Sequence, residues 1–158
     1  WVDLNRSFCT YDFSYNEYVK KNQNFVSATV CNSQKETQII KDVLEKYHNK
    51  GVHFILVSAT EEENTFEKKI ELLRKYEIDK YFDKFVNTDC KHIVSADVLV
   101  DDYIGNLDNY KKYHPFAYTI LFSAPHNKSI KSSIHTRVDN WEELDYCLGE
   151  ILNYYENL

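Results

Sequence analysis

The sequence contains very little glycine. Only Gly51, Gly105 and Gly149 occur among its 158 residues, which is about 2% where globular proteins average about 7%. Two common glycine-rich phosphate-binding loops, GxGxxG and GxxxxGK[ST], are therefore excluded, because neither spacing exists in the chain. Any phosphate-binding site in this protein must be built in another way.

Cysteines and long apolar runs are also scarce. The four cysteines, at positions 9, 31, 90 and 147, form no CxxC pair, and so few in a chain of this length do not indicate a disulfide scaffold. The longest apolar runs span only a few residues, whereas a membrane-spanning helix needs about 20. The first residues lack the basic-then-apolar order of a signal peptide. We therefore expect a cytoplasmic protein with reduced thiols and no membrane partner.

Positive charge is in the minority. The chain has 19 Lys and Arg against 25 Asp and Glu, for a formal net charge of −6. Nonspecific binding to nucleic acids depends on clustered positive charge, so this balance argues against a nucleic-acid partner. It is compatible with a small pocket for a single phosphate group.

Helical and strand patterns alternate along the chain, whose length predicts one domain over 1–158. A capping box at Ser33–Glu36 and a helix-ending glycine at Gly51 predict one helix between them. Asn64 and Asn140 predict the caps of two more helices, the last over 141–155, and another helix is expected near 106–113. Short apolar runs predict strands over 52–57, 84–86, 96–100 and 117–122.

This alternation predicts an α/β fold. We expect a Rossmann-like three-layer sandwich with a mostly parallel sheet covered by helices on both faces. In such sheets, ligands bind beyond the carboxyl ends of the strands. The aromatic residues on the apolar helix faces are most simply interpreted as core.

Polar residues follow the predicted strands. Asp3 follows a short strand at the start of the sequence, Ser58 follows the strand over 52–57, and Asp101 and Asp102 follow the strand over 96–100, with Lys91 just before it. Carboxylates suit Mg²⁺, which takes one or two of them together with phosphate oxygens and waters. A hydroxyl and an ammonium on a solvated rim could hold phosphoryl oxygens, and an aspartate beside a metal can attack phosphorus. This pattern predicts phosphoryl transfer.

Each of these residues also has a simpler interpretation. An Asp pair after a strand commonly forms a turn and a helix cap. Ser58 alone would be a turn or cap residue, and Lys91 alone would be a solvated surface lysine. Their order and placement together favour the phosphoryl-transfer site over these alternatives.

Four stretches of the sequence resemble a known family. FILVSATEEENTFEKKIELLRKY, CKHIVSADVLVDDYIGNL, TILFSAPHN and RVDNWEEL are similar to the bacterial branch of the cytosolic deoxyribonucleotidases, which belong to the haloacid-dehalogenase-like phosphatases. The resemblance covers about residues 35–152. It implies a Rossmann-like parallel sheet, dependence on Mg²⁺ and hydrolysis of a small phosphate ester, a nucleoside monophosphate, through an aspartyl-phosphate.

The resemblance also implies roles for individual residues. In such phosphatases the first Asp of a DxD motif is the nucleophile, which corresponds to Asp3. The second acidic position, which supplies catalytic acid and base and a backbone metal ligand, corresponds to Asn5. Ser58 and Ala59 are implied to bind the substrate phosphate. Lys91 is implied to stabilise the phosphoryl group during its transfer. Asp101 and Asp102 are implied to hold the metal together with the first motif.

The sequence departs from the family pattern in two ways. Asn5 stands where the family has an acid, and an amide can neither donate nor accept the catalytic proton near neutral pH. Only about 25 residues, 8–32, are available for the cap that family members insert after the first motif, so we expect a small or reduced cap. Asn5 favours an alternative function, a catalytically silent relative that binds a phosphate ligand or a protein partner. A receiver-type signalling domain is a third alternative, but it would need its acidic pair after the first strand.

Overall fold

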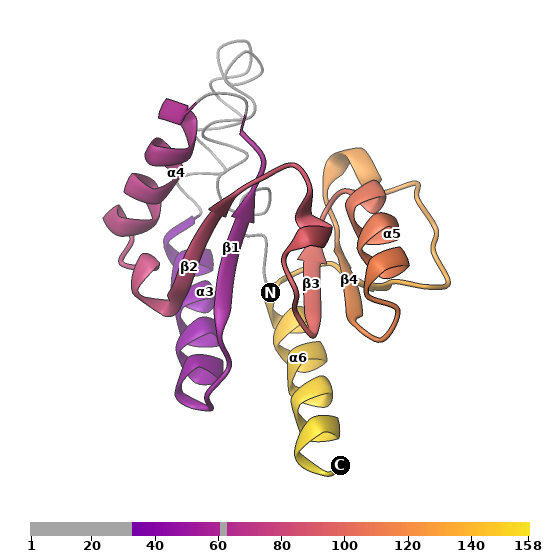
Figure 1. The fold of residues 1–158 in the computed structure, drawn as a ribbon. Coiled ribbons are helices and arrows are strands. Elements are labelled where there is room, and N and C mark those ends of the chain that lie inside the picture. Colours follow the sequence, from indigo (N-terminus) through magenta and orange to yellow (C-terminus); the bar gives the residue numbers. More distant parts are fainter. Residues whose placement is uncertain (1–32, 61–62) are drawn as a thin grey trace.

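The structure, a computed structural model, describes residues 33–60 and 63–158 (Figure 1). Asp3, Asn5 and the predicted cap over 8–32 lie outside the described residues. The side chains of the two predicted caps at Ser33–Glu36 and Asn64 lie outside them as well.

The described part of the chain alternates helices and strands, as the sequence predicted. The elements expected within residues 33–60 and 63–158 are present with small shifts at their ends, whereas the short strand expected before Asp3 lies outside the described residues. The three-residue strand β5, too short to give a periodic pattern, was not predicted. No helix within the described ranges is long and apolar enough to cross a membrane. The elements in chain order are α3 (Ser33–Asn49), β1 (Phe54–Ser58), α4 (Glu63–Lys75), η2 (Asp79–Tyr81), β2 (Phe82–Asn87), η3 (Lys91–Ile93), β3 (Val98–Asp101), α5 (Ile104–Tyr113), β4 (Tyr118–Phe122), η4 (Pro125–Asn127), β5 (Thr136–Val138) and α6 (Trp141–Glu156).

Every strand pair in the described part is parallel. β1 pairs with β2 in one sheet, and β4 lies between β3 and β5 in a second sheet. The predicted parallel arrangement is confirmed, although the described strands form two sheets. Ser58 is the last residue of β1 and Asp101 is the last residue of β3, so both predicted site positions lie at carboxyl ends of parallel strands.

The strands of the second sheet bury alternate residues on opposite faces. Val100 and Ile120 belong to a core cluster shared with α3 and α6, whereas Leu99 and Leu121 belong to a cluster shared with α5. This alternation follows from the two-residue period of a strand. Helices therefore cover both faces of this sheet, with α5 on one side, and the predicted layered α/β fold is confirmed (Figure 1).

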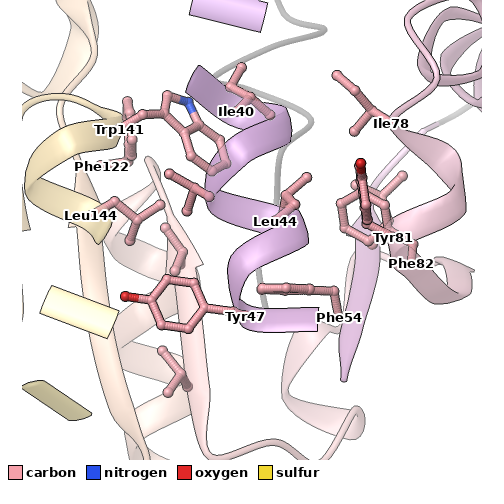
Figure 2. Close-up of a cluster of buried hydrophobic side chains, with 14 of the residues drawn as sticks. Ile40, Leu44, Tyr47, Phe54, Ile78, Tyr81, Phe82, Phe122, Trp141 and Leu144 are labelled. Carbon is pink, nitrogen blue, oxygen red and sulfur yellow. The ribbon is translucent and has the colours of Figure 1, made fainter. Parts of the chain in front are cut away.

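The larger core cluster joins α3 to α6 and to the strands (Figure 2). Tyr47 of α3 and Trp141 of α6 are both almost completely buried, and the Trp141 ring lies 6.1 Å from the ring of Phe122 in β4. Burying each such side chain stabilises the fold by roughly 1.5–3 kcal/mol. The Tyr47 hydroxyl donates to the Asp145 carboxylate at 2.8 Å, and burial raises the pKa of Tyr47. The aromatic residues on these helix faces are core, as predicted.

Two predicted helix ends are confirmed. Gly51, just after α3, has a φ of +83°, a left-handed conformation that glycine adopts without steric cost. The Asn140 side chain accepts a hydrogen bond from the Glu143 amide at 2.8 Å, and Glu143 accepts one from the Asp139 amide at 2.8 Å. These bonds satisfy backbone donors at the start of α6 that have no partner within the helix.

Candidate active site

Two adjacent carboxylates lie at the carboxyl end of the buried strand β3: Asp101 is its last residue and Asp102 follows it. All four residues of β3 are buried, and the Asp101 and Asp102 residues are only 1% and 3% exposed. Asp101 is buried as part of this strand, and Asp102 lies under the loop after β4, whose His126 and Asn127 contact it. Two buried neighbouring carboxylates need compensating charge or hydrogen bonds, since burial disfavours the ionised form.

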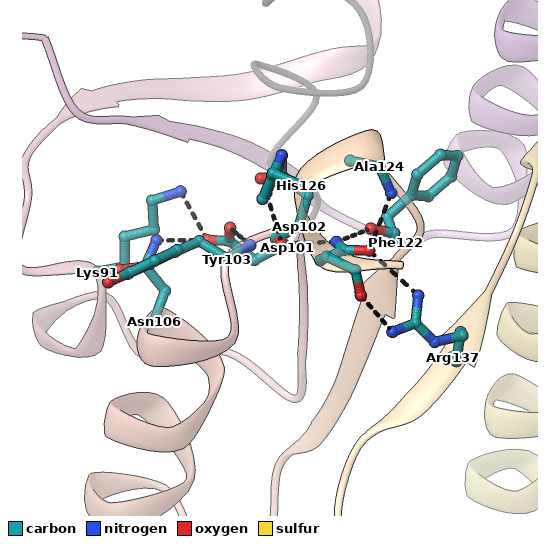
Figure 3. A network of polar contacts seen from close by, with 10 residues as sticks. Lys91, Asp101, Asp102, Tyr103, Asn106, Phe122, Ala124, His126 and Arg137 are labelled. Carbon is teal, nitrogen blue, oxygen red and sulfur yellow. Dashed lines mark hydrogen bonds and ion pairs between the residues drawn. The ribbon is translucent and has the colours of Figure 1, made fainter. Parts of the chain in front are cut away.

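Lys91 supplies part of that compensation for Asp101. Its Nζ lies 2.7 Å from Asp101 Oδ2, and the side-chain amide of Asn106 donates to the same oxygen at 2.9 Å. The Tyr103 backbone amide donates to the other oxygen, Oδ1, at 2.9 Å (Figure 3). Lys91 is only 4% exposed, so its interpretation as a solvated surface lysine is wrong.

The simpler interpretation of the Asp pair is correct in part. The bond from the Tyr103 amide to Asp101 closes a turn just before α5. However, the N-terminus of α5 has no side-chain cap, and a turn alone does not explain a buried ion pair with Lys91. Asp101 therefore holds the turn and also takes part in the buried polar cluster.

Asp102 is held through its backbone. Its carbonyl oxygen accepts hydrogen bonds from Asn127 Nδ2 at 2.7 Å and from His126 Nε2 at 3.2 Å. The same nitrogen of His126 lies 3.4 Å from the Asp102 carboxylate (Figure 3). The loop after β4 thus fixes the chain that carries the second carboxylate.

Ser58 ends β1 and is fully buried. Its Oγ accepts a hydrogen bond from Nζ of Lys69, a buried lysine of α4, at 3.1 Å. Its carbonyl oxygen accepts a bond from the Thr88 amide at 2.9 Å, and Ala59, which follows, is exposed. The expectation of a solvated rim is wrong for Ser58 and for Lys91, because the surrounding strands and helices exclude water from both.

The structure brings Lys91 and Asp101 into contact beside Asp102, and it places Ser58 on another strand. Lys91, Asp101 and Asp102 form one cluster at the end of β3. Ser58, followed by Ala59, lies at the end of β1 in the other described sheet, where its hydroxyl contacts Lys69. The roles of Asp3 and Asn5 stay predictions because both residues lie outside the described part.

Comparison with known proteins decides the family. Residues 16–150 match the profile of the family described as 5′ nucleotidase, deoxy (pyrimidine), cytosolic type C. The chain belongs to this family. It is also 31% identical over 108 residues to the 5′(3′)-deoxyribonucleotidases of Bacillus subtilis (strain 168) and of Bacillus phage SPbeta, a match that covers 68% of this chain and 56% of each relative. The chain thus spans just over half the length of these curated relatives.

Family membership confirms the deoxyribonucleotidase-like resemblance of the four sequence stretches. All four lie within residues 16–150, and the buried cluster at the end of β3 comes from the stretch CKHIVSADVLVDDYIGNL. The nucleotidase family also accounts for the parallel α/β architecture of the described residues.

The donor set at the end of β3 fits Mg²⁺. No group of three or more His, Cys, Asp or Glu side chains suited to a metal occurs among the residues that the structure describes. Mg²⁺, however, usually takes only one or two protein carboxylates and completes its shell with waters and phosphate oxygens. Asp101 and Asp102 supply two hard carboxylates, and Lys91 offsets one of their charges, so a nucleotidase of this family could hold the ion here.

Several polar residues of this site were not predicted. Lys69 contacts Ser58, Asn106 contacts Asp101, and Asn127 contacts Asp102. The burial of Lys69 could have been predicted from the sequence. It lies three residues after Phe66 and four before Leu73, which places it on the apolar face of its helix. Asn106 and Asn127 stand in the motifs DDYIGN and SAPHN, where no periodicity distinguishes them from ordinary turn residues.

Proposed function

We propose that this nucleotidase-family chain hydrolyses deoxyribonucleoside monophosphates with Mg²⁺ bound at Asp101 and Asp102. The observation that carries the proposal is the buried carboxylate pair at the end of β3, with Lys91 Nζ 2.7 Å from Asp101. A fold gains little stability from burying two neighbouring carboxylates, so a functional requirement for them is the simplest explanation.

In the proposed reaction Asp3 is the nucleophile. A carboxylate oxygen of Asp3 attacks phosphorus, the new P–O bond forms an aspartyl-phosphate, and the bond from phosphorus to the nucleoside oxygen breaks. The leaving oxygen takes a proton from solvent. Water then attacks the phosphorus of the aspartyl-phosphate and gives up a proton to solvent, the P–O bond to Asp3 breaks, and inorganic phosphate is released with the Asp3 carboxylate regenerated.

The other predicted residues act on the phosphoryl group and its charge. Lys91 has three N–H donors, so its contact with Asp101 is compatible with a second contact to a phosphoryl oxygen. The Ser58 hydroxyl, oriented by Lys69, and the backbone of Ala59 would donate to the remaining phosphoryl oxygens. Asp101 and Asp102, with Asp3 and the carbonyl oxygen of Asn5, would hold Mg²⁺, which supplies charge neutralisation during transfer.

The substrate class rests on the relatives. Both matched proteins are named 5′(3′)-deoxyribonucleotidases, so we propose 5′- and 3′-monophosphates of deoxyribonucleosides as substrates.

A panel of phosphate esters tests the proposed function. Phosphate release would be measured with Mg²⁺ from thymidine 5′- and 3′-monophosphates, a deoxypurine 5′-monophosphate and para-nitrophenyl phosphate. The proposal predicts release from the deoxynucleotides that is lost on Asp3→Asn substitution. Release that Asp3→Asn leaves unchanged would contradict it.

A second candidate function is favoured by Asn5. Without an acid at this position the chain would bind phosphate and turn it over poorly or not at all. In that case calorimetry would detect Mg²⁺-dependent binding of inorganic phosphate while no ester in the panel is hydrolysed. The same panel therefore separates the two functions.

A further inference from the structure

Asn127 is a completely buried amide that uses its full hydrogen-bonding capacity. It ends η4 and is 0% exposed. Its Nδ2 donates to the carbonyl oxygens of Asp102, at 2.7 Å, and Phe122, at 2.9 Å. Its Oδ1 accepts from the Ala124 amide at 3.0 Å and from the Arg137 guanidinium at 3.1 Å. Two donors and two acceptor positions are all that an amide side chain offers.

These bonds connect the carboxyl ends of β3 and β4 to β5. Asp102 follows β3, Phe122 ends β4, and Arg137 lies in β5. The β3 and β4 strands pair with each other directly, yet the loops beyond them are joined through the Asn127 side chain. The polar network is drawn in Figure 3, where the labelled residues Asp102, Phe122 and Arg137 converge.

Arg137 holds the backbone that carries Asn127. One guanidinium nitrogen donates to the Ser123 hydroxyl at 2.7 Å as well as to Asn127 Oδ1, and the other donates to the carbonyl oxygens of Asn127, at 3.0 Å, and Ile130, at 2.6 Å. The fork geometry of a guanidinium fixes several acceptors at once. Arg137 therefore sets both the side chain and the main chain of Asn127.

We propose that Asn127, held by Arg137, is a positioning residue that orients the Asp102 carboxylate toward the metal. The inference rests on the proposed Mg²⁺ site. Asp101 is fixed by three contacts to its own carboxylate. Asp102 accepts hydrogen bonds at its carbonyl oxygen from Asn127 and His126, and His126 also lies 3.4 Å from its carboxylate. Fixing that carbonyl fixes the peptide plane after Asp102, and with it the direction in which the Asp102 side chain leaves the backbone.

The coordination geometry of Mg²⁺ explains why the hydrogen bond from Asn127 to the Asp102 carbonyl oxygen matters here. The ion requires near-ideal octahedral positions at about 2.0–2.1 Å, so a small rotation of one ligand weakens the site. Residues that orient metal ligands typically change affinity by about 10- to 100-fold when substituted. A residue with only a structural role would instead lower stability and leave the metal affinity of the folded protein unchanged.

Asn127→Leu is the most direct variant. Leucine has nearly the shape of asparagine but neither a donor nor an acceptor. Unlike aspartate it adds no charge, so an altered Mg²⁺ affinity cannot come from a new carboxylate near the site. Arg137→Lys is the second variant, in case Asn127→Leu does not fold, because it keeps the charge and removes the fork. The matched control is Thr119→Val in β4, which removes a buried 2.6 Å contact to His135 on the same strand as Phe122.

Two measurements on the full chain are needed. Calorimetric titration with Mg²⁺ at a temperature where each variant is folded gives the metal affinity. Amide hydrogen exchange at Tyr103 in the metal-free protein reports the peptide that follows Asp102 and does not depend on metal binding. We expect Asn127→Leu to weaken Mg²⁺ binding at least about 10-fold and to accelerate amide exchange at Tyr103. Arg137→Lys should change both quantities in the same direction but less, and Thr119→Val should change neither.

The outcomes separate the positioning role from the proposed function. The positioning role is wrong if Asn127→Leu keeps the wild-type exchange rate at Tyr103 and the wild-type Mg²⁺ affinity. If Asn127→Leu does not fold, the same criterion applies to Arg137→Lys. An equal effect of Thr119→Val on both readouts also overturns it, because the effect would then reflect general loss of stability. If wild type binds no Mg²⁺ but Asn127→Leu still accelerates exchange at Tyr103, the proposed metal site is wrong and the control of the Asp102 peptide by Asn127 is supported.

Discussion

Lys91 and Asp101 form an ion pair from which water is almost fully excluded. Nζ lies 2.7 Å from Oδ2, and the two side chains are 4% and 0% exposed. The pair joins η3 to the end of β3. Burying both charges costs desolvation energy that their attraction offsets only when the geometry is good and further hydrogen bonds are present. Asn106 and the Tyr103 amide supply those bonds, so we expect the stability of this protein to depend on the pair.

Lys91→Met should therefore destabilise the protein by about 3–5 kcal/mol, because it leaves the Asp101 carboxylate buried without its counter-charge. The double variant Lys91→Met, Asp101→Asn should recover much of that loss, since a neutral amide needs no counter-charge. Urea unfolding of wild type and both variants measures the difference. A loss below about 1 kcal/mol for Lys91→Met, or a double variant that is no more stable than the single, would contradict the buried pair.

Lys69 should contribute to activity through Ser58. Its Nζ donates to Ser58 Oγ at 3.1 Å, which fixes the direction of the hydroxyl. Lys69→Met should lower the rate of phosphate release on the order of 10- to 100-fold, somewhat less than losing a direct stabiliser of the transferring group. Lys68→Met is the matched control, because Lys68 is the exposed neighbour on the same helix, and it should keep the wild-type rate. Equal rates for the two variants would rule out the role of Lys69.

The sequence predicts where part of the candidate site lies. Asp101, Asp102 and Ser58 were placed correctly at strand ends, because a run of apolar residues indicates a buried strand and the residues that close such a run lie at its carboxyl end. The burial of Lys91 and Ser58 was not predicted, because exposure at a strand end depends on which loops and helices cover it. β5 was missed because its three residues, Thr136–Val138, give no periodic pattern. Asn127 and Arg137 meet only through tertiary structure, so no local pattern reveals their contacts.

Acid should weaken the junction between α3 and α6 through Asp145. Partial burial alone would raise the pKa of this carboxyl, but hydrogen bonds from Lys46 and Tyr47 and the charges of Lys46 and Lys50 outweigh it and lower the pKa. A group whose pKa is lower in the folded state stabilises the fold above its unfolded pKa, and this contribution is lost as the pH falls through the folded value.

Asp145→Asn should therefore reduce the free energy of unfolding at pH 7 and make it less dependent on pH below about 4, where an unperturbed Asp titrates. Urea unfolding at pH 7 and pH 3 gives the comparison, and the gap between wild type and variant should narrow at the lower pH. Lys46→Met, which removes the 2.7 Å partner of Asp145, should reproduce part of the effect. A gap of the same size at both pH values would show that Asp145 acts by packing and not by its charge.

Asn5→Asp should increase nucleotide turnover. The family resemblance gives this position an acid that protonates the leaving oxygen and then activates water, and such a group contributes about 10²- to 10⁴-fold. Para-nitrophenyl phosphate leaves without protonation, so its release should gain less than that of thymidine 5′-monophosphate. The ratio of the two rates in wild type and in Asn5→Asp is the measurement. If wild type already hydrolyses nucleotides rapidly and the substitution adds nothing, another residue supplies the proton.

The most direct test of the proposed centre is the rate of phosphate release as Mg²⁺ is titrated into metal-free protein. Thymidine 5′-monophosphate would be the substrate, with wild type and Asp102→Asn compared under identical conditions. We predict no release in the presence of a chelator, a saturable rise of the wild-type rate with Mg²⁺, and at least about 10-fold more Mg²⁺ needed for half-maximal rate in Asp102→Asn. A full rate with chelator present, or identical Mg²⁺ curves for the two proteins, would contradict the assignment of Asp101 and Asp102 as the metal-binding carboxylates.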